Sequence, residues 1–179
     1  NLLGNLPWVL HNAWWQYRYS MDDQMLRGTV FPLLRRAVNL YLRYTEEGDD
    51  GRIHLQPTYS PETGVYRDAN FDLALLQWSC HTLLHACDRL GIDDELIPRW
   101  RDVVDRLVDF PTDEQSFMLA GDEPAPEFHR HLSHLLMIYP LYLVNIDQPG
   151  TESLLGHATS ACRRPCGVRA ARATRPTRR

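Results

Sequence analysis

Two kinds of helical segment alternate along this chain, and that alternation limits the folds it can adopt. Residues 7–20 and 70–90 carry apolar side chains on most sides of the predicted helix, which is typical of helices packed on all sides. Residues 94–110 instead place apolar side chains on one stripe and charged side chains opposite, as surface helices do. Inner helices covered by outer helices predict an all-α fold in two layers.

Two more helical segments and one long loop complete the predicted layout. A helix over residues 20–43 is expected to kink or restart at Pro32. The last apolar segment, residues 129–145, predicts a helix or a helix pair divided near Pro140. Residues 46–69 contain proline and glycine without a helical period, so we predict a structured loop and no strand. The chain should therefore form about five or six helices.

Charge divides the chain into a body and a tail. Residues 1–150 hold 12 arginines against 22 acidic residues, whereas residues 151–179 hold 7 arginines against one. An acidic body argues against a nucleic-acid partner, because phosphate neutralisation needs a basic face, and it favours a neutral ligand. The basic, low-complexity tail has few large apolar residues and cannot bury a core. We expect it to be disordered or an out-of-frame translation.

Membrane spans and disulfides are not expected. The apolar stretches are far shorter than the ~20 residues needed to cross a bilayer, so no membrane partner is predicted. Cys80 and Cys87 would lie ~10 Å apart along a helix, which is beyond disulfide reach. Cys162 and Cys166 form a C-x3-C pattern that matches neither a redox pair nor half a zinc ribbon.

The first candidate for chemistry is Glu62, in the segment P-T-Y-S-P-E-T-G at residues 57–64. A carboxyl group on a proline-flanked loop at the ends of buried helices can be held still and partly desolvated. Both conditions suit a general acid. The alternative is that Glu62 is an ordinary solvated turn residue.

The second candidate is the run His129-Arg130-His131-Leu132-Ser133-His134. Its three imidazoles could hold a zinc ion, or its Arg and His donors could bind hydroxyl and carboxylate groups of a ligand. On a helix, His131 and His134 would share a face. No acidic residue or matching cysteine accompanies the run, so ligand contacts are favoured over zinc, and a purely structural helix entry remains a third possibility.

Two further histidine patterns differ in what they predict. His81 and His85 have the spacing of a zinc-protease motif, but Thr82 replaces the required glutamate, so we expect core histidines without chemistry. In H-N-A-W-W at residues 11–15, the aromatic rings could stack on a sugar while His11 bonds its hydroxyls. Because neighbouring helical positions point about 100° apart, one of the two tryptophans must serve helix packing instead.

Several motifs occur in an order that resembles a known family. They are H-N-A-W-W, then F-P-L-L-R-R-A-V-N-L-Y-L before an acidic turn with D-G-R, then P-T-Y-S-P-E, then H-R-H-L-S-H-L-L-M-I-Y-P. Over residues 5–155 the chain resembles glycoside hydrolase family 95, which comprises α-L-fucosidases and some α-L-galactosidases. That resemblance implies a partial (α/α)6 barrel for residues 1–150.

The resemblance also implies an inverting mechanism without a cofactor. A glutamate in the S-P-E motif protonates the glycosidic oxygen, and an aspartate activates water on the opposite face of the sugar. Glu62 matches the acid, Arg130 and His131 match a sugar-contacting pair, and Trp14 matches an aromatic near the pocket. His11 and His134 are added as substrate contacts. The implied substrate is a fucosylated oligosaccharide or glycan, and relatives that digest glycans are often extracellular or periplasmic.

The sequence departs from the family pattern in two respects. Thr63 stands where asparagine usually follows S-P-E, and neither the downstream Q-I-D-G-N-F-G motif of the base nor the upstream N-x-N segment occurs. With about half of the helices of a closed barrel, the chain resembles the middle of a catalytic domain and should be inactive by itself. The rival hypotheses are a non-catalytic helical-hairpin scaffold and a zinc-binding protein.

Overall fold

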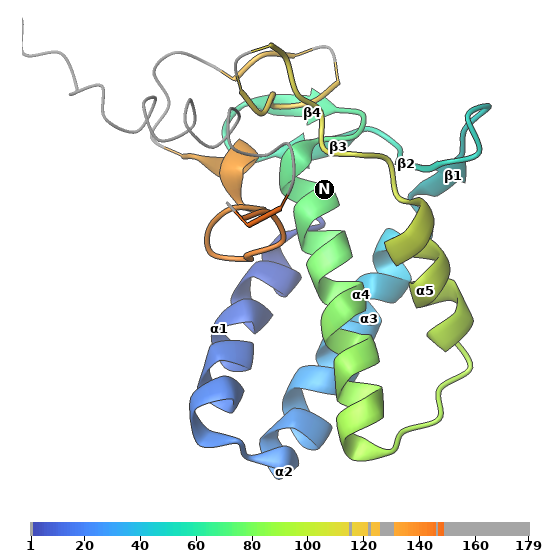
Figure 1. Ribbon diagram of the computed structural model, residues 1–179, viewed down its shortest axis with the longest axis vertical. Helices are drawn as coiled ribbons and strands as arrows, with labels where there is room; N and C mark the ends of the chain where they lie inside the picture. The colour runs from blue at the N-terminus through green and yellow to red at the C-terminus, as the bar shows by residue number, and fades with distance from the viewer. Residues whose placement is uncertain (1, 115, 122, 126–130, 146, 149–179) are drawn as a thin grey trace, which may run out of the picture.

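Four helices pack side by side in the computed structural model, which describes residues 2–114, 116–121, 123–125, 131–145 and 147–148. They are α1 (Asn5–Ser20), α3 (Phe31–Tyr41), α4 (Asn70–Leu90) and α5 (Ile97–Arg106). α4 lies in the middle and contacts each of the other three (Figure 1). The helices predicted from periodicity in this part of the chain are therefore confirmed, although α5 is shorter than the predicted helix over residues 94–110.

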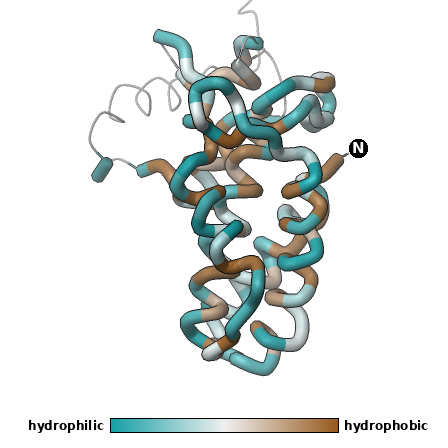
Figure 2. Tube along the Cα trace, turned by 90° about the vertical axis from the view of Figure 1, so that its right-hand side faces the viewer, coloured by the Kyte–Doolittle hydropathy of each residue, from teal (hydrophilic) through white to brown (hydrophobic). Residues whose placement is uncertain are grey.

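Burial around α4 explains its composition. Fourteen of its residues are buried, and they occupy all sides of the helix, as the apolar run over residues 70–90 predicts. α5 buries only Trp100 and Val103 and turns its charged residues outward. Hydrophobic and hydrophilic positions follow one another along the helices (Figure 2). Burial of apolar area at roughly 25 cal/mol per Å² is the main force that joins these helices.

α1 differs from the expectation that most of its faces are buried. Leu10, Trp14 and Tyr17 are buried against the core, but Val9 is 62% exposed and Leu6 is 41% exposed. The reason is geometric, because α3 and α4 lie on one side of α1 and no described segment covers Leu6 or Val9 on the other side.

The segment between α1 and α3 passes through Pro32 by changing its helical pitch. A short helix, α2 (Asp23–Met25), begins where Asp22 Oδ1 accepts the N–H groups of Gln24 and Met25 at 2.9 and 3.2 Å. A π-helical turn, η1 (Leu26–Val30), follows and leads directly into α3. Proline has no N–H and crowds the preceding turn, so a wider turn is a common way to keep the helix continuous. The predicted irregularity at Pro32 is confirmed.

The prediction of a strandless loop over residues 46–69 is wrong. Strands β1 (Thr45–Glu47) and β2 (Ile53–Leu55) form one antiparallel hairpin, and β3 (Thr58–Ser60) and β4 (Gly64–Tyr66) form another. The fold is thus mainly helical with two small sheets at one end of the helices (Figure 1). Strands of three residues are too short to show an alternating pattern, so sequence periodicity could not reveal them.

The predicted last helix is also wrong for the part of residues 129–145 that the structure describes. A single 3-10 turn, η2 (Ser133–Leu135), is followed by irregular turns. Leu135, Leu136 and Met137 are consecutive and all buried, because the segment packs against the end of α4. Continuous burial, and not helical spacing, explains this apolar run.

The remaining expectations concern the membrane, the thiols and the tail. Within the described ranges no helix is both long and apolar enough to cross a membrane. Cys80 and Cys87 are free, buried thiols, as their spacing predicts. The predicted tail, with Cys162 and Cys166, lies outside the described residues.

Candidate active site

The β3–β4 hairpin holds Glu62 in its turn. Ser60 pairs with Gly64, and the Ser60 carbonyl oxygen accepts both the N–H and the hydroxyl of Thr63 at 3.3 Å. Tyr66 donates its hydroxyl to the Thr63 carbonyl at 3.1 Å. Glu62 has a φ of 58°, a left-handed conformation that is uncommon for residues other than glycine. The turn therefore fixes the position from which the carboxyl group projects.

The hairpin is anchored to the core by its inward-facing residues. Thr58 is 3% exposed and Ser60 is fully buried, while Tyr59 between them points outward. The Thr58 hydroxyl donates to Asp72 Oδ2 at 2.6 Å, and Asp72 belongs to the first turn of α4. The turn with Glu62 thus projects from a strand that is bonded to the central helix.

Glu62 and His131 meet at the edge of the same cleft. Their Oε1 and Nε2 atoms are 3.3 Å apart, and both side chains are a little under half exposed. The two residues belong to separate sequence motifs, and the fold brings them together. Their exposure leaves the carboxyl group accessible to a ligand.

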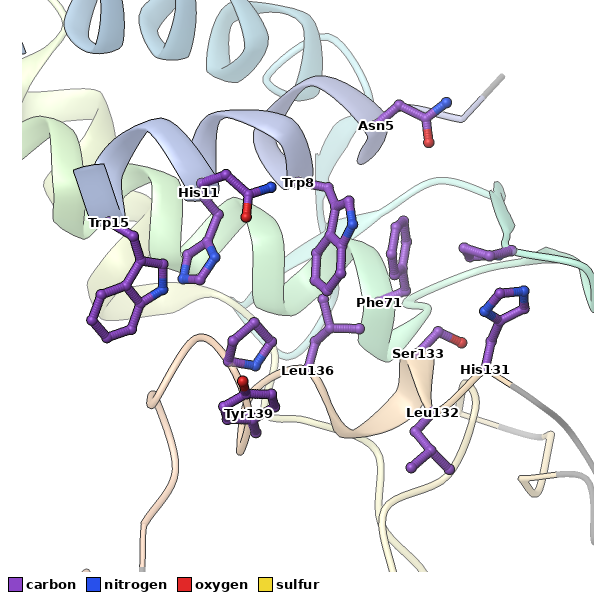
Figure 3. Close-up of a pocket in the computed structure, with 13 residues that line it drawn as sticks. Asn5, Trp8, His11, Trp15, Phe71, His131, Leu132, Ser133, Leu136 and Tyr139 are labelled. Carbon is purple, nitrogen blue, oxygen red and sulfur yellow. The ribbon is translucent and has the colours of Figure 1, made fainter. Parts of the chain in front are cut away.

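A pocket of about 650 Å³ opens beside this pair. One wall is formed by α1, and the other is formed by residues 131–140 (Figure 3). Pro61, which precedes Glu62, and Phe71 of α4 lie between the two walls. The lining residues are Asn5, Trp8, His11, Asn12, Trp15, Pro61, Phe71, His131, Leu132, Ser133, Leu136, Tyr139 and Pro140. These described residues supply aromatic rings, amides and imidazoles, and none of them is an arginine or a carboxylate, which suits a neutral polar ligand.

His11 lies on the α1 wall of this pocket. It is 5% exposed, and its ring contacts those of Trp78 and Trp15 edge to face, with centroids 5.1 and 5.9 Å apart. Burial lowers the pKa of His11, although a hydrogen bond to the Pro140 carbonyl oxygen opposes this effect. Because a neutral imidazole donates through one nitrogen only, its other nitrogen can accept a hydrogen bond from a hydroxyl group.

The other predicted contacts lie elsewhere. Trp14 is 9% exposed and packs against Tyr17 and His85, and it faces a second hollow of about 430 Å³. His134 is buried in η2 and is not among the residues that line the first pocket. Arg130 lies outside the described residues. The roles of all three as sugar contacts remain predictions.

Two histidine predictions concern metal binding. The described residues contain no group of three or more side chains that could hold a metal ion, but His129 of the zinc hypothesis lies outside them. His81 and His85 are exposed on α4 and line the second hollow, so the expectation of core histidines is wrong. The outward side of α4 near these residues is less covered than its apolar composition suggested.

Part of the site does not belong to any of the motifs that predicted it. Trp8 and Phe71 line the pocket, and Asp72 supports the hairpin beneath it. The sequence does contain a signal for Asp72, which is the one acidic residue in the apolar run N-F-D-L-A-L-L. An acid in such a run is expected to be buried, and a buried carboxyl group needs hydrogen-bond partners.

A carboxyl group and an imidazole at the rim of a pocket lined with aromatic and neutral polar groups can contact the ring faces and hydroxyl groups of a carbohydrate. The comparison with known proteins agrees. Residues 2–164 match the model of the "Glycosyl hydrolase family 95 catalytic domain", and the chain belongs to this family of glycoside hydrolases.

A curated relative supports the same assignment. The chain is 27% identical over 158 residues to "Alpha-L-fucosidase 2" of Arabidopsis thaliana. The match covers 79% of this chain and 18% of the relative, so the chain corresponds to less than one fifth of that protein's length.

Proposed function

We propose that this chain forms the acid-bearing part of an inverting glycoside hydrolase of the α-L-fucosidase type. It would act on terminal fucosyl or L-galactosyl residues of oligosaccharides, as part of an (α/α)6 barrel. The observation that carries the proposal is the 3.3 Å approach of Glu62 and His131 at the rim of the aromatic pocket. The family assignment and the fucosidase relative support the choice of sugar.

Each residue of the site has a chemical role in this proposal. Glu62 protonates the glycosidic oxygen, so that the leaving group departs as an alcohol. His131, with Arg130, holds sugar hydroxyl groups beside the acid, and His11, on the opposite wall, accepts a hydrogen bond from a sugar hydroxyl group. Trp14 and His134 are retained as predicted contacts, while Trp8 and Trp15 offer ring faces for stacking. No cofactor takes part.

An inverting reaction also needs a general base on the far side of the sugar. The two carboxyl groups of such enzymes stand about 6.5–9.5 Å apart, which leaves room for a water molecule between them. The family's base motif does not occur in this sequence, so the base would come from additional polypeptide. We therefore expect sugar binding, but not turnover, from the 179-residue chain.

The decisive experiment compares Glu62→Gln with the unaltered protein in a polypeptide that includes the base motif. Hydrolysis of an oligosaccharide, which has a poor leaving group, should fall by about 10²–10⁴-fold, the usual contribution of a general acid. An aryl fucoside with a good leaving group should lose much less, and fucose affinity should stay the same. Unchanged oligosaccharide hydrolysis would remove Glu62 from the mechanism.

A binding experiment on the chain itself separates this proposal from a scaffold without sugar binding. In NMR titrations with L-fucose, the signals of His131 and of the Trp15 indole should shift, because both side chains line the pocket. The Trp100 indole is the matched control, because it is fully buried between α5 and the core. No shift at any residue of the pocket at saturating sugar would favour the scaffold.

A further inference from the structure

Asp72 is a buried carboxyl group that the proposed mechanism does not use. Its side chain is fully buried, yet it accepts two short hydrogen bonds, from Tyr41 Oη to Oδ1 and from Thr58 Oγ1 to Oδ2, both at 2.6 Å. A backbone hydrogen bond from Gly4 adds a third partner. Burying an acid is costly, so a carboxyl group with this many partners points to a specific structural task.

The partners of Asp72 come from three separate parts of the fold. Gly4 precedes α1, which forms one wall, and Tyr41 ends α3. Thr58 begins β3, which leads into the turn with Glu62. Asp72 itself follows Phe71, which lines the pocket. One carboxyl group on α4 therefore ties together the start of α1, the end of α3 and the acid-bearing hairpin.

The bond to Thr58 is the direct link between α4 and the hairpin. Only three residues separate Thr58 from Glu62, and the hairpin is braced internally through Thr63 and Tyr66. A displacement of Thr58 is therefore carried to the turn and changes the distance between Glu62 and His131. Burial raises the pKa of Asp72 to about 6, which fits a carboxyl group enclosed by these elements.

We propose that Asp72 is a positioning residue that, through Thr58, sets the location of Glu62 relative to His131 and the pocket. The inference rests on the proposed function, because Asp72 acts through a residue whose catalytic role is itself proposed. It adds a residue outside the pocket lining to the machinery of the site.

The first test uses NMR on the 179-residue chain and needs no activity. Glu62→Gln defines how far the His131 imidazole signals move when the carboxylate is lost. Thr58→Val, which removes the donor to Asp72, should move the same signals in the same direction by at least about half as much. Thr58→Ser restores the hydroxyl and should return the signals to their original positions.

Tyr41→Phe is the matched control. It removes the other side-chain hydrogen bond to the same carboxyl group and leaves the bond to Thr58 in place. The His131 signals should stay where they are in the unaltered chain. If Tyr41→Phe moves them as far as Thr58→Val does, or if Thr58→Val leaves them in place, the positioning role is wrong. Should Thr58→Val fail to fold, Asp72→Asn substitutes a weaker acceptor and should cause a smaller shift in the same direction.

A kinetic test separates this inference from the proposed function. In the active polypeptide, Thr58→Val should lower kcat for a poor leaving group by about 10-fold or more, and change KM and the rate on an activated aryl fucoside by less than about threefold. Equal losses on both substrates would indicate a general defect and contradict positioning. If Glu62→Gln has no effect on hydrolysis, the proposed function fails, whereas an effect of Glu62→Gln alone would reject only the role of Asp72.

Discussion

Glu62 Oε1 lies 3.3 Å from His131 Nε2, although one residue belongs to a hairpin turn and the other to an irregular segment far along the chain. Both side chains are a little under half exposed, so solvent screens their attraction. Exposed pairs of this kind contribute about 0–1 kcal/mol to stability. Stability therefore does not account for the meeting of these two groups, which agrees with the binding role proposed for them.

A double-mutant cycle measures how much the interaction between Glu62 and His131 contributes to stability. Glu62→Gln, His131→Ala and the double variant should give a coupling energy below about 1 kcal/mol in urea unfolding, because the pair is screened. The cycle removes the effects of other contacts that each side chain makes. A coupling of several kcal/mol would assign the pair to the fold and weaken its functional interpretation.

Gly4 cannot gain a side chain without disturbing the pocket. A Cβ atom there would lie 2.3 Å from Phe71 Cε1 and 2.6 Å from Leu75 Cδ1. Gly4→Ala should therefore lower the free energy of unfolding by about 1–3 kcal/mol, as overpacking does. Gly28→Ala is the control, because nothing lies within 4 Å of its added Cβ, and it should leave stability unchanged or raise it. A fully stable Gly4→Ala variant would contradict the close packing of α1 on α4.

The buried acid on α4 predicts a dependence of stability on pH. Burial raises the pKa of Asp72 to about 6, although hydrogen bonds from Thr58 and Tyr41 oppose the shift. The unfolded value is about 3.9, so between these values the folded state binds more protons than the unfolded state. The contribution of Asp72 is therefore largest at low pH and declines as pH rises towards 6. Urea unfolding from pH 4 to 7.5 should show this decline in the difference between the unaltered chain and Asp72→Asn, and a difference that rises with pH would contradict it.

The pKa of His54 is also raised, but here the fold favours the charged form of the side chain. Partial burial lowers the pKa of His54, but hydrogen bonds and charge from Asp68 and Asp50 outweigh it and raise the pKa overall. Its Nδ1 lies 2.8 Å from Asp68 Oδ2. The stability from the charged imidazole is complete below about pH 6.5 and is lost as pH rises through the raised folded value. NMR titration should give a midpoint above 6.5 that Asp68→Asn lowers, and a midpoint below 6.5 in the unaltered chain would refute the interaction.

The two thiols of α4 should be unreactive in the folded protein. Burial raises the pKa of Cys87 to about 11 and raises that of Cys80 further, and the thiolate is the form that reacts with alkylating reagents. Iodoacetamide should leave both unlabelled in the native chain and label both in urea. Peptide mass spectrometry distinguishes them from Cys162 and Cys166, and rapid native labelling of Cys87 would show that this end of α4 opens readily.

Helices could be predicted from the sequence because their apolar spacing repeats over many residues. The run at residues 70–90 and the stripe at residues 94–110 both meet that condition. The hairpins at residues 45–66 could not be predicted, since each strand has three residues and is held by pairing, and β3 is held in addition by Asp72. The run at residues 135–137 was misinterpreted because an apolar composition reports burial and does not specify the backbone conformation.

The site was predictable to the extent that its chemistry lies in short motifs. Glu62 and His131 could be recognised because each lies in a distinctive short motif, and the fold places the two side chains together. The sequence could not show which of Trp14 and Trp15 lines the pocket and which packs against the core, because this depends on which side of α1 is occupied by α4. Asp72 was missed, since its partners Thr58 and Tyr41 are remote in sequence.

The α1 wall of the pocket is built from residues on successive turns, beginning at Asn5 and ending at Trp15. Each added residue rotates the helix by about 100°, so one inserted or deleted position within α1 would turn every later ring away from the cavity. The facing wall of irregular turns has no such constraint. Among homologues, changes in length should therefore accumulate on that second wall, while α1 keeps its residue count.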